Sequence, residues 1–262
     1  ALATGGVSRD PTAARLATLE DAVLFASAED EIASVQAGEM DGHRQLWVTG
    51  TSMTLLTVDA KLMPILPLAV HPEARDMLVV AFGMGSGYRA GLIAGLAVDA
   101  VELVPSVPTM YGYFYEDADT YANHPNGRII IADGRNYVEL TGKTYDIVVT
   151  DPPPPIESAG VSVIAGRDYY VAAKRKLNPG GVMMQWMPYG QRLDEFQAQV
   201  RTFADVWPEV LIAFGPGGYG FFMLGSERPL AFTPGTLEAA IARPGVYADL
   251  SSAFDSPVLS RE

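Results

Sequence analysis

The chain carries a series of short, almost continuous apolar runs separated by segments with helix-compatible spacing. Met77–Phe82 and Val98–Val104 are two such runs, and a helix over about residues 88–95 fits between them. Apolar runs of this length, without regular polar alternation, are typical of strands that are buried on both faces of a parallel sheet. Strands that alternate with helices in this way predict an α/β protein.

The same alternation continues to the end of the chain. Further strands are expected over Arg128–Ala132, Tyr145–Thr150 and Val182–Met187, and helices over 166–177, 193–207 and 235–242. The last two apolar runs, 209–214 and 219–224, flank a Gly-Pro-Gly-Gly turn, so they are expected to form a hairpin. The pattern predicts a doubly wound, mostly parallel, seven-stranded Rossmann-like sheet whose last strand is antiparallel.

The N-terminal region has a different pattern. Thr12–Ala28 has apolar residues at helical spacing, which predicts an amphipathic helix, and two strands are expected over Glu31–Gln36 and Arg44–Thr51. A tight turn at residues 39–42 joins these strands into a hairpin. We therefore expect a small β subdomain ahead of the main sheet. The predicted division is tail and helix (1–28), β subdomain and connector (29–70), Rossmann-like nucleoside-binding domain (71–226), and C-terminal helix and tail (227–262).

The turn after the first core strand reads Gly83-Met84-Gly85-Ser86-Gly87. Glycines allow a sharp turn and a close approach of the backbone to a ligand. The free N–H groups at the start of the following helix favour an electron-rich ligand group. Glu102, near the end of the next strand, is placed to accept hydrogen bonds from ribose hydroxyls. Together these features predict a nucleoside-containing ligand.

Two further acids follow strand ends. Asp133 comes directly after the strand over 128–132, and Asp151 directly after the strand over 145–150. In open α/β sheets, ligands bind beyond the carboxyl ends of the strands. Asp133 is placed to accept the exocyclic amine of adenine, and Gly134 leaves room for the ring. Asp151, beside a proline-rich loop over 152–164, is placed to take a proton from an attacking amine.

Composition narrows the chemistry. The 262-residue chain is 48% hydrophobic and has a net charge of −13, so a basic surface for nucleic acid is not expected. The negative charge is compatible with a cationic small substrate. The absence of cysteine excludes disulfides and thiolate sites, and the three histidines, His43, His71 and His124, lie in turn-like contexts. No metal site is predicted.

The order of these motifs resembles that of a known family. The glycine turn, the Val-Glu-Leu acid at Glu102, the Ala-Asp-Gly at Asp133, the Tyr-Asp-Ile-Val-Val-Thr-Asp-Pro run ending beyond Asp151 and the later Asn-Pro-Gly-Gly resemble the polyamine aminopropyltransferases, or spermidine synthases. The pair Gln185-Trp186 is similar to one in divergent, spermidine-synthase-like domains that are often joined to membrane segments. The resemblance covers about residues 30 to 226.

This resemblance implies roles for individual residues. Decarboxylated S-adenosylmethionine, or its methylthioadenosine product, would be bound by Gly83, Gly85, Ser86, Gly87, Glu102, Asp133 and Gly134. Asp151 would be the catalytic base, and Glu157, in the proline-rich loop, is a candidate for the amine substrate. The nucleoside is a co-substrate, so no prosthetic group is expected. The implied acceptor is a cationic amine, and a homodimer or homotetramer is expected.

Other functions remain open at this point. The chain could act on intact S-adenosylmethionine as a methyltransferase, lyase or cyclase, or bind a nucleoside without catalysis. Because it begins at Ala1 and the resembled domains are often joined to membrane segments, the expected location is cytoplasmic, either as a whole protein or as the soluble domain of a membrane-anchored one with a region ahead of residue 1.

Overall fold

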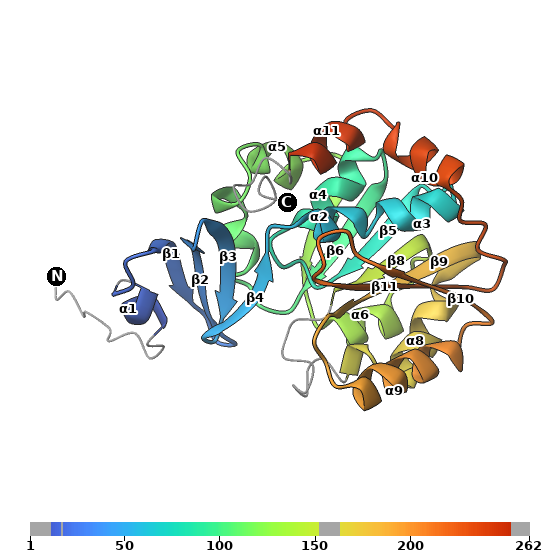
Figure 1. The fold of residues 1–262 in the computed structure, drawn as a ribbon, viewed down its shortest axis with the longest axis horizontal. Coiled ribbons are helices and arrows are strands. Elements are labelled where there is room, and N and C mark those ends of the chain that lie inside the picture. Colours follow the sequence, from blue (N-terminus) through green and yellow to red (C-terminus); the bar gives the residue numbers. More distant parts are fainter. Residues whose placement is uncertain (1–11, 17, 152–162, 253–262) are drawn as a thin grey trace.

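The computed structural model describes residues 12–16, 18–151 and 163–252. A small four-stranded sheet lies beside a seven-stranded sheet that has helices on both faces (Figure 1). The predicted α/β architecture, with a small β subdomain ahead of the main sheet, is therefore confirmed. Most of the proline-rich loop expected over 152–164 lies outside the described residues.

The small sheet is antiparallel and follows chain order. After the short helix α1 (Thr12–Leu16), its strands are β1 (Ala22–Glu29), β2 (Ser34–Met40), β3 (His43–Val48) and β4 (Thr51–Leu55). The helix expected over 12–28 is wrong, because it ends at Leu16 and the second half of that segment is β1. Strand β1 pairs with β2 on both sides of an irregularity at Phe25, where the register shifts, and this pairing overrides the helical spacing of the apolar residues.

The large sheet has the strand order β10-β11-β9-β8-β5-β6-β7. Strand β11 runs antiparallel to its neighbours β9 and β10, as the predicted C-terminal hairpin requires. The strands are β5 (Asp76–Val80), β6 (Ala97–Glu102), β7 (Gly127–Ile131), β8 (Tyr145–Thr150), β9 (Leu177–Pro188), β10 (Glu209–Phe214) and β11 (Gly220–Ser226). The helix expected over 166–177 ends at Arg175, and the Asn-Pro-Gly-Gly motif lies within β9, where Leu177 pairs with Tyr145 before the register shifts.

Helices cover the two faces of this sheet in two groups (Figure 1). One group comprises α2 (Val58–Leu62), α3 (Ile65–Val70), α4 (Ser86–Ile93), α10 (Pro234–Ile241) and α11 (Val246–Ser251). The other comprises α6 (Gly134–Leu140), α8 (Arg167–Arg175) and α9 (Leu193–Ala204). The crossover from β6 to β7 contains the 3₁₀ helix η1 (Pro108–Tyr113) and the helix α5 (Ala118–Ala122).

Strand β5 shows why the apolar runs are continuous. Met77 and Val79 pack in the hydrophobic cluster on one face, whereas Leu78 and Val80 pack in the cluster on the other. All four side chains are at most 3% exposed. A strand that is buried on both faces leaves no position for a polar side chain, and it therefore lacks the alternation of a half-exposed strand.

Hydrogen bonds join the small sheet to the β6–β7 crossover. The Ser106 N–H donates to Asp30 Oδ2 at 2.8 Å, and Arg44 Nη1 donates to the carbonyl of Phe114 at 3.0 Å. The crossover also reaches α4, because Tyr88 Oη donates to the carbonyl of Tyr121 at 3.0 Å. These contacts hold the small sheet beside the carboxyl edge of the large one.

Candidate active site

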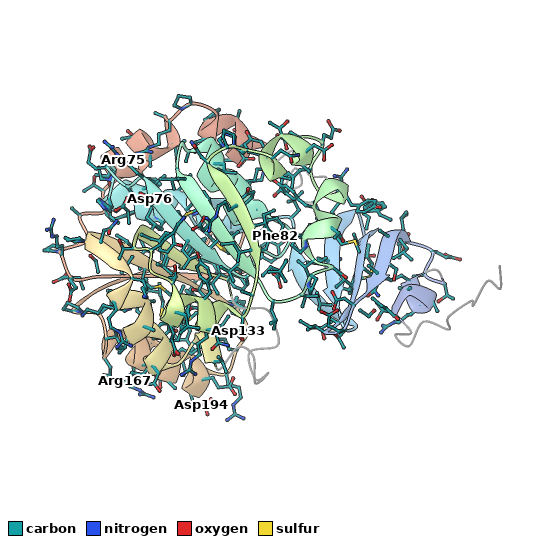
Figure 2. All side chains as sticks on the ribbon, turned by 180° about the vertical axis from the view of Figure 1, so that it is seen from behind. Arg75, Asp76, Phe82, Asp133, Arg167 and Asp194 are labelled. Atoms are coloured by element: carbon teal, nitrogen blue, oxygen red, sulfur yellow. The ribbon has the colours of Figure 1, made fainter. Side chains whose placement is uncertain are left out.

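Four neighbouring strands place the predicted residues along one edge of the large sheet. Asp151 follows β8, the glycine turn follows β5, Glu102 ends β6 and Asp133 follows β7, and these strands are consecutive in the sheet. The hydrogen bonding between β8 and β5 extends one residue past the end of β8, because Asp151 N–H donates to the Val80 carbonyl at 3.2 Å. Figure 2 shows Phe82 and Asp133 on the side near the small sheet, with Arg75 and Asp76 at the opposite end.

The glycine turn is a tight connection between β5 and α4, and two of its residues adopt the left-handed backbone conformation. Gly83 and Gly85 have φ angles of 54° and 79°, which glycine adopts without steric cost. A Cβ at Gly85 would lie 2.6 Å from the ring of Tyr111, so no larger residue fits there. Ala81 also has a positive φ, 71°, which is strained for a residue with a side chain. The helix begins at Ser86, so Ser86 and Gly87 belong to its first turn.

Ser86 is the polar residue of this turn. Its side chain is buried, and Ser86 Oγ lies 2.7 Å from Tyr115 Oη, which comes from the β6–β7 crossover. Tyr115 packs against Tyr111 edge-on, with ring centroids 5.6 Å apart. The aromatic residues of the crossover therefore pack against the glycine turn.

Glu102 is buried and held by backbone donors. Its Oε2 accepts from Phe82 N–H, and its Oε1 accepts from Val104 N–H, both at 3.0 Å. Burial raises the pKa of Glu102, and the backbone N–H groups oppose that rise. The carboxylate thus bridges the start of the glycine turn and the end of β6. The backbone N–H groups of Gly83 and Leu103 also face the carboxylate and lower its pKa.

Asp133 has a structural role at the start of α6. It is the N-cap of α6, and its Oδ1 accepts from Asn136 N–H at 2.8 Å. Gly134 is needed for close packing, because a Cβ there would lie 2.5 Å from Val80 Cγ1. Both residues are half-buried at the carboxyl edge. The predicted contact with adenine stays a prediction.

Asp151 faces a small pocket beside the glycine turn. The described residues that line this pocket include Ala60 and Met63 from the α2 side, Ser86 from α4, and Asp151. Most of the lining is apolar, and burial in it raises the pKa of Asp151 to about 7. A carboxyl group with this pKa exchanges its proton readily near neutral pH, as a general base must. Glu157 lies outside the described residues.

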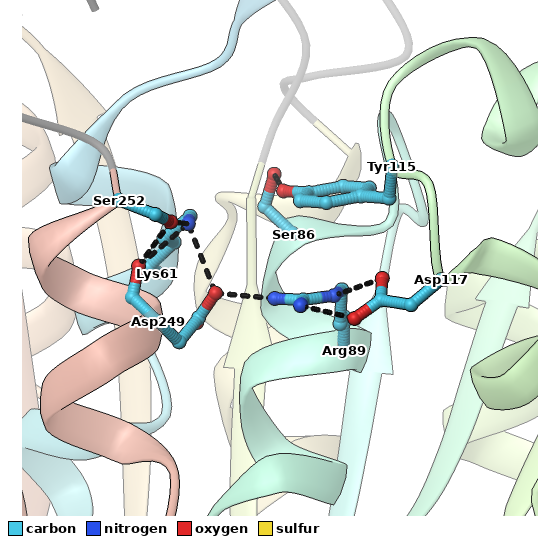
Figure 3. Close-up of polar contacts among 7 residues, drawn as sticks. All are labelled: Lys61, Ser86, Arg89, Tyr115, Asp117, Asp249 and Ser252. Carbon is cyan, nitrogen blue, oxygen red and sulfur yellow. Dashed lines mark hydrogen bonds and ion pairs between the residues drawn. The ribbon is translucent and has the colours of Figure 1, made fainter. Parts of the chain in front are cut away.

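The sequence did not reveal a partly buried ionic network beside this pocket. In Figure 3, Asp249 of α11 contacts both Lys61 of α2 and Arg89 of α4, and Arg89 also contacts Asp117 from the crossover. Lys61 Nζ lies 2.9 Å from Asp249 Oδ1, and Arg89 Nη2 lies 2.5 Å from Asp117 Oδ2. Arg89 Nη1 also contacts Asp249 Oδ1. The partners are far apart in the chain, so no local spacing signals the network.

A second buried acid was also missed. Asp59 of α2 is 1% exposed, and its Oδ1 accepts from Gly217 N–H at 2.9 Å in the turn between β10 and β11. Burial raises its pKa, and the backbone N–H groups of Gly217 and Tyr219 oppose that rise. A Cβ at Gly215 would lie 2.4 Å from Asp59 Oδ2, which explains the glycine at that position.

Metal and membrane features complete the description. Within the described ranges, no group of three or more His, Asp or Glu side chains is arranged to hold a metal ion. A helix with the length and apolarity to span a bilayer does not occur among the described residues.

Comparison with solved structures defines the fold class. A spermidine synthase in complex with the transition-state analogue AdoDATO matches with a TM-score of 0.69, at 18% identity, over 87% of this chain and 88% of that chain. The human methyltransferase-like protein 13 in complex with SAH matches with a TM-score of 0.54, also at 18% identity, over 74% of this chain and 89% of that chain. The chain therefore has the Rossmann-like fold that spermidine synthases share with methyltransferases.

Sequence comparison narrows this class. No family model matches. A polyamine aminopropyltransferase of Pyrobaculum calidifontis is 28% identical over 205 residues, 68% of this chain and 66% of that protein. One of Escherichia fergusonii is 26% identical over 156 residues, 56% of this chain and 53% of that protein. The chain spans between half and two thirds of these relatives. The sequence is thus similar, at low identity, to polyamine aminopropyltransferases.

Proposed function

We propose that the protein transfers an aminopropyl group from decarboxylated S-adenosylmethionine to an amine acceptor and releases methylthioadenosine. The observation that carries this proposal is the position of Asp151. It lines the pocket next to the glycine turn, in a chain whose sequence relatives are polyamine aminopropyltransferases. The proposed site thus has a nucleoside half, over β5, β6 and β7, and a reacting half at the end of β8.

The proposed reaction is a single displacement. The Asp151 carboxylate first accepts a proton from the acceptor ammonium, and the nitrogen lone pair that this frees attacks the aminopropyl carbon bonded to the sulfonium sulfur. A C–N bond forms while the C–S bond breaks, and the bonding pair moves to sulfur to give a neutral thioether. The product nitrogen is left as an ammonium, and Asp151 then gives its proton to solvent. The enzyme contributes mainly the alignment of nitrogen, carbon and sulfur, together with this proton transfer.

The nucleoside half is assigned to residues at the carboxyl edge. We propose that Glu102 accepts hydrogen bonds from the ribose hydroxyls, since its backbone contacts hold it rigidly at the end of β6. Gly83, Gly85, Ser86 and Gly87 would let the backbone approach the ligand, and Asp133 with Gly134 would contact the adenine. The net charge of −13 favours a cationic acceptor. Size-exclusion chromatography with light scattering would test the expected homodimer or homotetramer.

Calorimetry on the purified chain tests the nucleoside half. The ligands are methylthioadenosine, S-adenosylmethionine and its decarboxylated form. We expect methylthioadenosine and the decarboxylated form to bind more tightly than the intact one. Absence of binding by all three would overturn the proposal, and preference for the intact form would favour a reaction on S-adenosylmethionine itself.

Mass spectrometry tests the transfer. After incubation with decarboxylated S-adenosylmethionine and a panel of amines, the acceptor should gain one aminopropyl group for each methylthioadenosine released. Asp151→Asn should reduce turnover by about 10² to 10⁴-fold, the usual contribution of a general base, without weakening methylthioadenosine binding. Asp146→Asn is a matched control, because Asp146 is a half-buried carboxylate at the start of β8, bonded to Arg75 N–H and Asn178 Nδ2. Equal turnover in the two variants would remove Asp151 from the mechanism.

A further inference from the structure

The pocket beside the glycine turn has two helical walls. Ala60 and Met63 contribute from α2 and the residue that follows it, and Ser86 and Gly87 contribute from the first turn of α4. These two helices come from different parts of the chain. The separation between them sets the width of the pocket in which Asp151 lies, so the contacts that fix this separation affect the geometry of the site.

One carboxylate bridges the two walls. Asp249 Oδ1 accepts from Lys61 Nζ at 2.9 Å and also contacts Arg89 Nη1. Lys61 is the neighbour of Ala60 on α2, and Arg89 lies one turn beyond Ser86 on α4. Lys61 Nζ donates in addition to the Asp249 carbonyl and to Ser252 Oγ, at the end of α11. The C-terminal helix α11 is thereby attached to both walls at once.

The ionic network is also connected to Ser86, a polar residue of the pocket lining, through Tyr115. The Arg89 guanidinium lies 4.8 Å from the centroid of the Tyr115 ring, within the range of a cation–π contact. Tyr115 Oη in turn lies 2.7 Å from Ser86 Oγ. A chain of contacts thus runs from Asp249 through Arg89 and Tyr115 to Ser86 (Figure 3).

The charges explain why this arrangement depends on Asp249. Lys61 and Asp249 are 3% and 7% exposed, so both charges are removed from water. Burial lowers the pKa of Lys61, and the charge of Asp249 opposes that effect. The network holds two cations and two anions, and Asp117 pairs with Arg89. Without Asp249, Lys61 loses its nearest counter-charge while Arg89 keeps Asp117. Buried ion pairs contribute little net stability but can specify geometry.

We propose that Asp249 is a positioning residue that clamps α2 to α4 and so sets the width of the pocket at Ser86 and Asp151. It contacts neither nucleoside nor acceptor and acts through Lys61 and Arg89. The inference deepens the proposed function by adding the C-terminal helix to the site. The clamp itself is a property of the ligand-free protein, so its presence can be measured whether or not the proposed transfer occurs.

Hydrogen–deuterium exchange on the ligand-free protein tests the clamp. In Asp249→Asn we expect the backbone amides of residues 60–63 and 86–89 to exchange at least tenfold faster than in the original chain. Asp146→Asn, at the opposite end of the sheet, should leave both segments unchanged. Faster exchange in α11 alone would overturn the proposal, because α11 would then be attached without restraining the walls.

Lys61→Met provides a milder variant if Asp249→Asn does not fold. It removes the link to α2 but leaves Asp249 in contact with Arg89, so faster exchange is expected in residues 60–63 and not in 86–89. Equal exchange in both segments would contradict the proposed division of the clamp into two arms.

Ligand binding separates positioning from general stability. Decarboxylated S-adenosylmethionine carries an aminopropyl tail toward the pocket, and methylthioadenosine does not. In Asp249→Asn, the affinity for the decarboxylated form should fall about tenfold, and that for methylthioadenosine less than threefold. A parallel loss for both ligands would indicate a structural role only and overturn the proposal. Absence of binding by the original chain would instead contradict the proposed function, and the exchange result would still decide the clamp.

Discussion

At the scale of single residues, Asp151 combines an apolar environment with a position at a strand end. Its raised pKa, about 7, follows from burial alone, since burial is the sole cause of the shift. A carboxyl group in this state is less favourable for folding when ionised than when neutral. The property that suits Asp151 to proton transfer therefore reduces the stability of the folded chain as pH rises above about 4, the reference pKa of the carboxyl group.

This relation gives a prediction with a defined sign. The pKa of Asp151 is about 7 in the folded protein and 3.8 in the reference state, so the folded protein binds the proton more tightly. The Asp151 contribution to the free energy of unfolding falls as pH rises from about 4 to 7. Asp151→Asn removes this penalty. We expect the variant to melt a few degrees higher than the original chain at pH 8 and at the same temperature at pH 4, as measured by calorimetry. If Asp151→Asn melted at a lower temperature than the original chain at pH 8, the ionised carboxylate would stabilise the folded protein, and the prediction would be wrong.

The pH dependence of turnover should mirror this titration. Activity with decarboxylated S-adenosylmethionine is expected to rise with a midpoint near pH 7 as Asp151 loses its proton, and to level off above it.

At the scale of elements, the glycine turn depends on two separate requirements. Gly85 needs a positive φ of 79°, and it also needs the absence of a side chain, since a Cβ would lie 2.6 Å from the Tyr111 ring. Gly95, at the end of the same helix, has a similar φ of 87° but has open space around it. The two glycines therefore allow backbone strain to be separated from steric fit.

We predict different costs for alanine at these two glycines. Gly95→Ala should lower the free energy of unfolding by about 1 to 2 kcal/mol, the usual cost of a left-handed backbone. Gly85→Ala carries the same cost plus about 1 to 3 kcal/mol for the displaced aromatic ring. Urea unfolding measures both. Methylthioadenosine affinity should fall in Gly85→Ala alone; equal losses in the two variants would mean that the turn itself does not approach the ligand.

The elements also show which predictions the sequence could support. The strands of the large sheet were predictable because continuous apolar runs occur where both faces are buried, as in Met77 to Val80. Strand β1 was not predictable from the sequence. Leu16, Leu19 and Val23 have the spacing of an amphipathic helix, and the segment is extended because it pairs with β2. Val23 is 56% exposed, so this apolar residue does not mark a buried helix face.

The candidate site likewise contains residues that the sequence indicated and contacts that it did not. The glycine turn, Glu102, Asp133 and Asp151 were visible in sequence because strand ends in a parallel sheet gather at one edge. The contacts of Asp59 with the turn at Gly215, and of Asp249 with Arg89, join segments more than 150 residues apart. A single sequence carries no local signal for such pairs.

At the scale of the whole molecule, Asp30 connects the small sheet to the large one. Burial opposes the ionisation of Asp30, but hydrogen bonds from Ser106, Ala33 and Ile32 outweigh it and lower the pKa to about 2. The depressed pKa means that Asp30 contributes stability above about pH 4 and loses it as pH falls toward 2. The junction is thus expected to weaken in acid before Asp30 is fully protonated.

We predict that Asp30→Asn lowers the melting temperature at pH 7 by about 2 to 4 °C, the shift that roughly 1 kcal/mol produces in a domain of this size. The difference from the original chain should largely disappear near pH 2, where Asp30 itself takes up a proton. Thermal unfolding at both pH values checks the prediction. The exposed pair of Arg192 and Asp194 serves as a control, because Asp194→Asn should shift the melting temperature by less than about 1 °C. A difference that persists unchanged at pH 2 would mean that the charge of Asp30 is not involved.

The placement of Asp249 also has a consequence for the order in which the protein is made. It is separated from Arg89 by 160 residues, which a ribosome adds in roughly 10 to 30 s. During that interval Lys61 and Arg89 have been translated but lack this carboxylate, while β5 and β6 are already available to pair. A nascent chain can therefore assemble much of its sheet before both walls of the pocket acquire their shared counter-ion, so the pocket is completed only after Asp249 has been synthesised.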